Sequence, residues 1–454
     1  MHHTHLIKPV IDKNYPVAAY GKGIYIYDNT GKAYIDGSSG AVTASIGHAV
    51  PEMIAAVAEQ TKKISFVYRS QFTSEAAELL AARLSHLAPG NDKYWSFFVN
   101  SGSEATETAM KIAIQHWQEK GLYKKHKIIS RWNSYHGITI GALSMSGHTE
   151  RRERFIPLLE DYPAVSAPNC YRCPFQQTYP SCQLTCADEL DRAIRRVGAE
   201  HVAAFIAEPI VGAAGAAIVP PPGYYERIKE ICEFHNVLFI ADEVMTGLGR
   251  TGKMFGMDHW DAEADIITLG KGMSAGYTPM AATLVKEHVM EPILNGSKSV
   301  MSGHTYSANP QSAAVSLAVL DYIEKHDLVT ESAENGQYLF QKLEALVSRH
   351  EMIGHVRGKG LLIGVEFVAN KFTKEPFTKG LGVTSRIVQR AQDNGLLVYP
   401  SSAGLEGKLG DAVIISPPLT INRAEIDQLV EIFDRTVSEV AEEIRSLGAF
   451  DTVI

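Results

Sequence analysis

The segment Val237-Leu238-Phe239-Ile240-Ala241-Asp242 is the best single indication of how this chain folds. It has a counterpart in Thr268-Leu269-Gly270-Lys271-Gly272, which follows a second apolar run. Short continuous apolar runs followed by turn residues are typical of parallel strands that are buried on both faces. Open sheets of such strands bind ligands just beyond the carboxyl ends of the strands. We therefore expect the Asp242 carboxylate and the Lys271 amine in one crevice.

Lys271 and Asp242 together suggest a cofactor. Lys271 stands between Gly270 and Gly272, which makes it a poor core residue but a suitable amine for a Schiff base with an aldehyde. An aspartate suits the pyridinium nitrogen of such a cofactor. Each residue alone has a plainer explanation, because most Asp and Lys side chains at strand ends are simply solvated. The pair predicts a site for pyridoxal 5'-phosphate.

Composition narrows the class of protein. The chain has 454 residues, of which 45% are apolar and 21% charged, enough for two or three packed units. A formal net charge of -8 offers no basic field for nucleic acid. No apolar stretch has the length that a bilayer requires, and Met1 to His5 carries no signal-peptide apolar region. We expect a cytoplasmic protein without nucleic-acid or membrane partners.

The middle of the chain alternates between strand-like and helical patterns. Apolar runs occur at 97–99, 128–129, 202–206, 237–241, 266–267 and 281–285. This alternation predicts an α/β fold with a mostly parallel sheet covered on both faces.

The two ends of the chain predict a second, smaller unit. A hairpin is expected over 23–36, and helices after Pro51 and over 74–87. A long helix follows Pro310, then strands at 361–363, 396–398 and 413–415, and a last helix whose capping box is Asn422 and Glu425. We divide the chain into 1–70, the N-terminal part of the small domain; 71–325, the large cofactor-binding domain; and 326–454, the C-terminal part of the small domain.

Three further segments follow strands and could contact a cofactor. Ser101-Gly102-Ser103 opens a helix, where free N–H groups suit a phosphate, although such residues are also ordinary caps. Tyr135-His136-Gly137 offers a ring that could stack on a pyridine. Glu208 ends another strand and could orient the cofactor or simply be solvated.

Four of the five cysteines, Cys170, Cys173, Cys182 and Cys186, fall in one short segment. Thiolates at such spacing could hold zinc or act in redox chemistry. The spacing matches no standard zinc finger, and Pro174 and Pro180 favour a surface loop whose thiols have no function.

The order of these motifs resembles the class III (omega) aminotransferases over nearly the whole chain. The shared segments are Ser-Gly-Ser-Glu-Ala at 101–105, Tyr-His-Gly at 135–137, Glu-Pro at 208–209, Asp-Glu-Val at 242–244, the glycine-rich 247–252, Gly-Lys-Gly at 270–272, and Thr305 in His304-Thr-Tyr-Ser307. The stretches 31–36, 356–361 and 416–418 resemble the family as well.

The resemblance implies a pyridoxal-phosphate enzyme of fold type I, a homodimer with active sites shared between subunits. It implies that Lys271 binds the cofactor covalently and moves the proton during the reaction. Asp242 would keep the ring nitrogen of the cofactor protonated. Gly102 and Ser103 would hold the phosphate, and Thr305 would reach the phosphate of the partner subunit. Tyr135 would stack on the ring, His136 would lie beside it, and Glu208 would be the acidic neighbour that gates substrate carboxylates.

The resemblance also implies transfer of an amino group to a small keto acid such as pyruvate, with pyridoxamine phosphate as the intermediate. Relatives often bind an α-carboxylate with an arginine near the last strands, and none stands there in this chain. We therefore expect donors whose amine is remote from a carboxylate: ω-amino acids, diamines or simple amines. Arg69 is the candidate for the acceptor carboxylate, with Lys408 as the other nearby cation; Arg69 could also be a solvated interface residue.

Two alternatives stay open. A dialkylglycine decarboxylase or an aminomutase of the same fold would use the same Lys271 and Asp242. From another class, a zinc- or redox-responsive protein without catalysis would use the cysteine segment.

Overall fold

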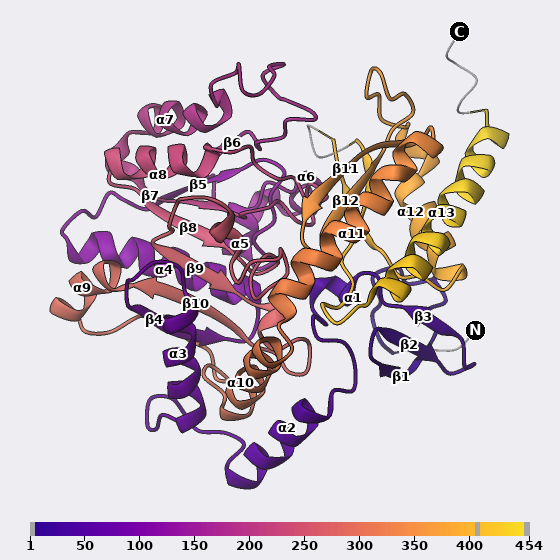
Figure 1. Cartoon of the computed structure of the whole chain (residues 1–454). Helices are drawn as coiled ribbons and strands as arrows, with labels where there is room; N and C mark the ends of the chain where they lie inside the picture. The colour runs from indigo at the N-terminus through magenta and orange to yellow at the C-terminus, as the bar shows by residue number, and fades with distance from the viewer. Residues whose placement is uncertain (1–4, 405–408, 449–454) are drawn as a thin grey trace.

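The centre of the molecule is a seven-stranded sheet, seen in a computed structural model that describes residues 5–404 and 409–448. The strand order is β4 (Tyr94–Val99), β10 (Ala281–Lys286), β9 (Ile266–Leu269), β8 (Leu238–Asp242), β7 (Val202–Ala207), β5 (Lys127–Arg131) and β6 (Ala164–Val165). Strands β5 to β9 pair in parallel, and β10 runs antiparallel to both of its neighbours, β4 and β9 (Figure 1). This is the mostly parallel α/β sheet that the sequence predicts.

The middle strands are apolar throughout because both of their faces are buried. In β8, Leu238 and Ile240 pack in a cluster with Ile112 of helix α4 (Gly102–Glu119). Phe239 and Ala241 point to the other face and pack with residues of helix α8 (Tyr224–Phe234). Successive side chains of a strand alternate between faces, so two covered faces require a continuous apolar run.

The helices flank the sheet and connect its strands. The α4 helix begins at a cap in which Ser101 Oγ accepts a hydrogen bond from the Glu104 N–H at 3.3 Å. The other helices of this part are α3 (Glu75–Leu87), α5 (Ile140–Met145), α6 (Thr149–Arg152), α7 (Thr185–Val197), α9 (Glu287–Asn295) and α10 (Pro310–Lys325). No helix in 5–404 or 409–448 is long and apolar enough to cross a membrane.

Two small antiparallel sheets use the ends of the chain. One contains β1 (Ala18–Lys22), β2 (Tyr25–Asp28) and β3 (Ala33–Ile35), which confirms the predicted hairpin. The other has the order β11 (Ile353–Lys359), β12 (Leu362–Phe367), β14 (Asp411–Ile415) and β13 (Tyr399–Ser402). An isolated bridge between Ile35 and Leu396 joins the two regions.

The strand predicted at 396–398 is wrong, because the strand of this region begins at Tyr399. Leu396 and Val398 are buried; Leu396 forms an isolated bridge with Ile35, and its N–H donates to the Ala391 carbonyl at 2.8 Å. The apolar run therefore indicates burial rather than sheet pairing. The strand that follows lies at the edge of its sheet, where Pro400 is tolerated because one side needs no N–H donor.

Helices α1 (Ser39–Val42), α2 (Pro51–Lys63), α11 (Leu328–Arg349), α12 (Val383–Asp393) and α13 (Arg423–Ser446) complete the fold. The predicted capping box of the last helix is confirmed. Asn422 Oδ1 accepts from the Glu425 N–H, and Glu425 Oε2 accepts from the Asn422 N–H, each at 3.0 Å.

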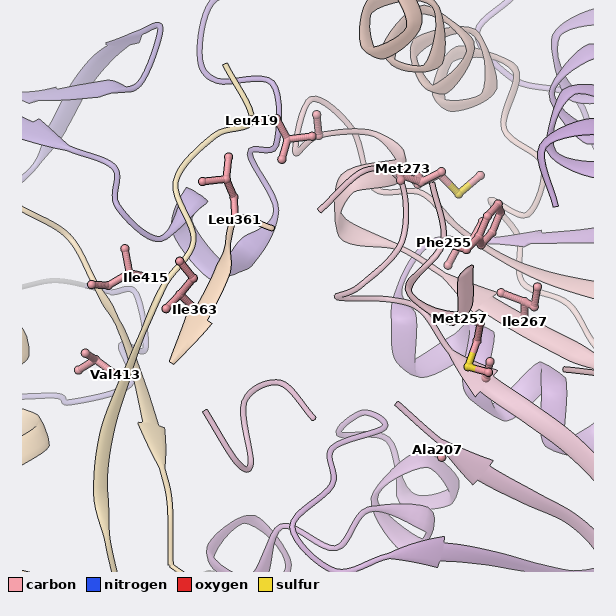
Figure 2. Packing of buried hydrophobic residues seen from close by; sticks show 14 of the residues in the cluster. Ala207, Phe255, Met257, Ile267, Met273, Leu361, Ile363, Val413, Ile415 and Leu419 are labelled. Carbon is pink, nitrogen blue, oxygen red and sulfur yellow. The ribbon is translucent and has the colours of Figure 1, made fainter. Parts of the chain in front are cut away.

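One hydrophobic core joins the large sheet to the C-terminal sheet. Figure 2 shows Ala207 and Ile267 of the large sheet, with Phe255 beside Ile267, and Ile363 and Val413 of the small sheet; all five belong to one cluster. The large sheet is thereby held against the small sheet. The domain boundaries at 70 and 325 stay a prediction.

Candidate active site

A cavity of about 180 Å³ lies at the carboxyl ends of the central strands. Each wall comes from a segment that directly follows a strand, namely β4, β5, β7, β8 and β9. The lining residues are Gly102, Ser103, Tyr135, His136, Gly137, Glu208, Ala213, Asp242, Val244, Met245 and Lys271. Residues far apart in the sequence meet there because parallel strands end at one edge of the sheet.

The carboxylate of Asp242 is held from three directions. Its Oδ1 accepts hydrogen bonds from Thr268 Oγ1 at 3.0 Å and from the Val244 N–H at 3.2 Å. Its Oδ2 lies 2.7 Å from His136 Nδ1. Asp242 is only 4% exposed, so these contacts fix its direction with little competition from water.

The other ring nitrogen of His136 is unsatisfied. His136 Nε2 is buried and has no hydrogen-bond partner among the described residues. Leaving a buried polar group unpaired costs about 1–3 kcal/mol. An orphaned nitrogen in the wall of the cavity fits a site that is completed by a bound polar group.

Lys271 reaches the cavity from a tight turn after β9. Its backbone is left-handed, with φ 42°, and Gly270 precedes it. Lys271 as a whole residue is partly exposed, but its side-chain amine is buried. This burial lowers the pKa of Lys271 to about 8, while the carboxylates of Glu208 and Asp242 oppose the shift. A substantial fraction of the amine is therefore neutral at mildly alkaline pH.

Glu208 is buried beside the same cavity. Burial raises the pKa of its carboxyl, and the nearby Asp242 adds to this effect. Its Oε1 accepts from the Tyr135 N–H at 2.9 Å, and its Oε2 accepts from the Gly212 N–H at 2.8 Å. Glu208 thus fixes the backbone that carries the Tyr135 ring.

The start of α4 forms a cradle that fits a phosphate. A Cβ added at Gly137, where φ is +134°, would lie 2.5 Å from Ser103 Oγ. A Cβ at Gly102 would lie 2.9 Å from Val244 Cγ1. Only glycine keeps this space open, and it lies where the first N–H groups of an 18-residue helix are free. The residues present therefore fit pyridoxal phosphate.

Arg69 and Thr305 lie outside this cavity. Arg69 is exposed, donates a hydrogen bond from Nη2 to the Ser302 carbonyl, and places Cζ 5.0 Å from the centroid of the Phe97 ring. Thr305 is exposed a few residues further along the same segment. The roles of both residues stay predictions. Lys408 lies outside the described residues.

The four clustered cysteines line one small cavity near Pro221. Burial raises the pKa of Cys186 to about 12, and the neighbouring thiols contribute. No group of three or more His, Cys, Asp or Glu side chains is arranged to hold a metal ion within 5–404 and 409–448.

The sheet, the lysine and aspartate at its carboxyl edge, and the glycine cradle define an enzyme of pyridoxal-phosphate fold type I. The family is more specific. The model of aminotransferase class III matches residues 10–437, so this chain belongs to the class III aminotransferases. Members of the class depend on pyridoxal phosphate.

Known relatives cover almost the whole chain. An uncharacterized aminotransferase of Bacillus subtilis, YodT, is 56% identical over 97% of this chain and 99% of its own. The taurine–pyruvate aminotransferase of Bilophila wadsworthia is 34% identical (95% and 94% covered), and the putrescine–pyruvate aminotransferase of Pseudomonas aeruginosa is 33% identical (96% and 93%).

Solved structures of transaminases share the fold. An (S)-enantioselective omega-transaminase from Thermomicrobium roseum superposes with a TM-score of 0.90 at 35% identity, covering 96% of both chains. The omega transaminase from Pseudomonas jessenii in complex with PMP has a TM-score of 0.89 at 34% identity, covering 95% of this chain and 94% of its own.

Sequence reasoning missed several residues that shape the site. Thr268 and Val244 hold Asp242, and Ala213 and Met245 line the cavity. Thr268 lies just before the Gly-Lys-Gly motif, so the sequence could have suggested it as a hydrogen-bond partner of Asp242. Arg151, whose Cζ lies 4.4 Å from the centroid of the Tyr135 ring, stands in a short polar helix that carries no recognisable motif.

Proposed function

We propose that this aminotransferase moves an amino group from an amine, a diamine or an ω-amino acid to a small keto acid such as pyruvate, with pyridoxamine phosphate as the carrier. The observation that carries the proposal is the meeting of Lys271 and Asp242 in one cavity beside a phosphate cradle. Relatives named for taurine–pyruvate and putrescine–pyruvate transfer support a donor that has no carboxylate on the carbon bearing the amine.

The residues divide the work between binding and proton transfer. Bound pyridoxal phosphate would supply the electron sink for the reaction. The Lys271 amine would hold the cofactor and move the proton at the reacting carbon. Asp242, oriented by Thr268 and the Val244 N–H, would keep a proton on the ring nitrogen. Tyr135 would stack on the ring, His136 would lie beside it, and Glu208 would gate substrate carboxylates.

The phosphate would be shared between subunits of a homodimer. Gly102 and Ser103 would hold it from one chain, and Thr305 of the other chain would complete the site. The exposure of Thr305 and Arg69 in their own chain is consistent with a role in the partner. In this arrangement Arg69 would bind the acceptor carboxylate. We place the enzyme in the cytoplasm.

A visible spectrum of the holoenzyme tests the proposal. Addition of an amine should bleach the cofactor band to the pyridoxamine form, and pyruvate should restore it with formation of alanine. Release of carbon dioxide from the donor would instead favour the decarboxylase, and a positional isomer of the donor would favour the aminomutase. A spectrum that no amine in a broad panel alters would contradict transamination.

A further inference from the structure

A second cavity of about 440 Å³ adjoins the first. The two share Ala213, and Arg151, which lines the outer cavity, lies over the ring of Tyr135, which lines the inner one. The two cavities therefore meet at Ala213 and at the contact between Arg151 and Tyr135. The outer cavity includes side chains of Arg151, Lys379, Thr384, Ser402 and Asp411.

Most charged groups of the outer cavity are already engaged. Lys379 Nζ pairs with Glu150 Oε1 at 2.9 Å. Asp411 Oδ1 accepts the N–H and the Oγ1–H of Thr384, each at 2.8 Å, at the beginning of α12. His148 is neutral near pH 7, because burial lowers its pKa to about 4.

Arg151 is the exception. Among the described residues its guanidinium has no carboxylate partner within ion-pair distance. It contacts Tyr135: Cζ lies 4.4 Å from the ring centroid, and the guanidinium is close enough to the phenol oxygen to hydrogen-bond with it. The same guanidinium lies within electrostatic reach of the reactive amine. A guanidinium has five N–H donors, so its contacts with one tyrosine leave other N–H groups available to an anion.

We propose that Arg151 binds an anionic group at the far end of the amine donor, so that the outer cavity selects ω-amino acids and their sulfonate analogues over amines without a negative charge. The inference rests on the proposed function and narrows its donor class. Because Arg151 lines the outer cavity rather than the inner one, it suits an anion remote from the reacting amine. A bidentate contact with guanidinium recognises carboxylate, and a sulfonate offers the same pair of oxygens.

The test compares donors of matched length on the holoenzyme. The first half-reaction is followed by the visible spectrum for 4-aminobutyrate against butylamine, and for taurine against ethylamine. For each pair we take the ratio of kcat/KM for the anionic donor to kcat/KM for the uncharged donor. We expect this ratio to be greater than one in the wild type. In Arg151→Gln that ratio should fall about tenfold or more, and Arg151→Lys should restore part of it. Arg154→Gln, an exposed residue on the same segment, is the matched control and should keep the wild-type ratio.

Binding without turnover provides an independent reading. Butyrate, which has no amine, should perturb the spectrum of the wild-type holoenzyme at saturable concentrations, and much more weakly in Arg151→Gln. The proposal is overturned if Arg151→Gln keeps both the donor ratio and the butyrate affinity, or if the wild type prefers the uncharged amines. If butylamine bleaches the cofactor while the anionic donors show no preference, transamination stands and only the anion site fails. If no amine reacts, the proposed function fails, and butyrate binding still decides the role of Arg151.

Discussion

At the scale of single residues, Lys271 is the group without which the proposed chemistry cannot proceed. Its amine lies in the cavity with Asp242 and Glu208. We predict that Lys271→Ala folds, because Lys271 belongs to none of the hydrophobic clusters formed by the described residues. Its turnover should fall by at least about 10³-fold, since attachment and proton transfer both need the amine. Circular dichroism checks the fold and steady-state alanine formation checks the activity. Wild-type turnover in this variant would refute the assignment of the site.

The same amine should set the pH dependence of cofactor loading. Burial lowers the pKa of Lys271 to about 8, so the amine is protonated below that pH and neutral above it. Because only the neutral amine attacks an aldehyde, the loading rate of apoenzyme with pyridoxal phosphate should rise about tenfold per pH unit below 8 and level off above it. Stopped-flow absorbance from pH 6 to 10 measures this profile. A rise that continues to pH 10 would show an ordinary lysine, and Lys271→Ala serves as the blank.

At the scale of elements, the junction between β4 and α4 depends on two glycines that keep the cradle open. A Cβ at Gly137 would lie 2.5 Å from Ser103 Oγ and 2.7 Å from Ala142 Cβ, at a φ of +134°. We predict that Gly137→Ala weakens pyridoxal phosphate binding by about tenfold or more, because the start of the helix must shift away from the phosphate.

Equilibrium dialysis of the cofactor measures the effect of Gly137→Ala, and the melting temperature of the apoenzyme separates it from a loss of stability. Gly380→Ala is the matched control, since a Cβ there meets nothing within 4 Å. Equal affinities in the two variants would remove Gly137 from the phosphate site.

At the scale of the whole molecule, an exposed apolar surface predicts a dimer. Phe66 and Tyr306 stack edge to face with centroids 5.9 Å apart, and Tyr68, Phe72 and Met301 are at least half exposed nearby in the sequence. Large aromatic and apolar side chains that are exposed together are typical of protein–protein interfaces. We predict a dimer by analytical ultracentrifugation, and a shift toward monomer with loss of cofactor in Tyr306→Glu. Phe372→Glu, at a residue that is 97% exposed elsewhere, should change neither property. A fully active monomer at high dilution would contradict the shared site.

Arg69 belongs to the same scale, because its proposed target lies in the partner subunit. Arg69→Ala should weaken binding of the keto-acid acceptor by roughly 2 kcal/mol or more, the size of a charge-assisted contact. The two half-reactions are measured separately by single-turnover absorbance with pyruvate and with butylamine. Equal losses in both would indicate an interface or packing role through Ser302 and Phe97 instead.

The sequence alone was enough for the α/β class, the parallel strands and the groups that meet at their ends. Continuous apolar runs can be buried on both faces only in a covered sheet, and glycine-flanked Lys271 and strand-ending Asp242 must then share an edge. Local sequence patterns also predicted the hairpin and the capping box at Asn422, because hydrogen bonds between residues close in the sequence form both.

Only the tertiary structure decided which distant side chains complete the site. Local patterns carry no information on the contact between His136 and Asp242, the orphaned His136 Nε2, or the position of Arg151 over Tyr135. They also misplaced the strand near Leu396, because an apolar run reports burial and not the partner that a backbone pairs with. Those contacts join residues from separate strands and loops, and their distances are set by how the sheet, its helices and the small C-terminal sheet pack on one core.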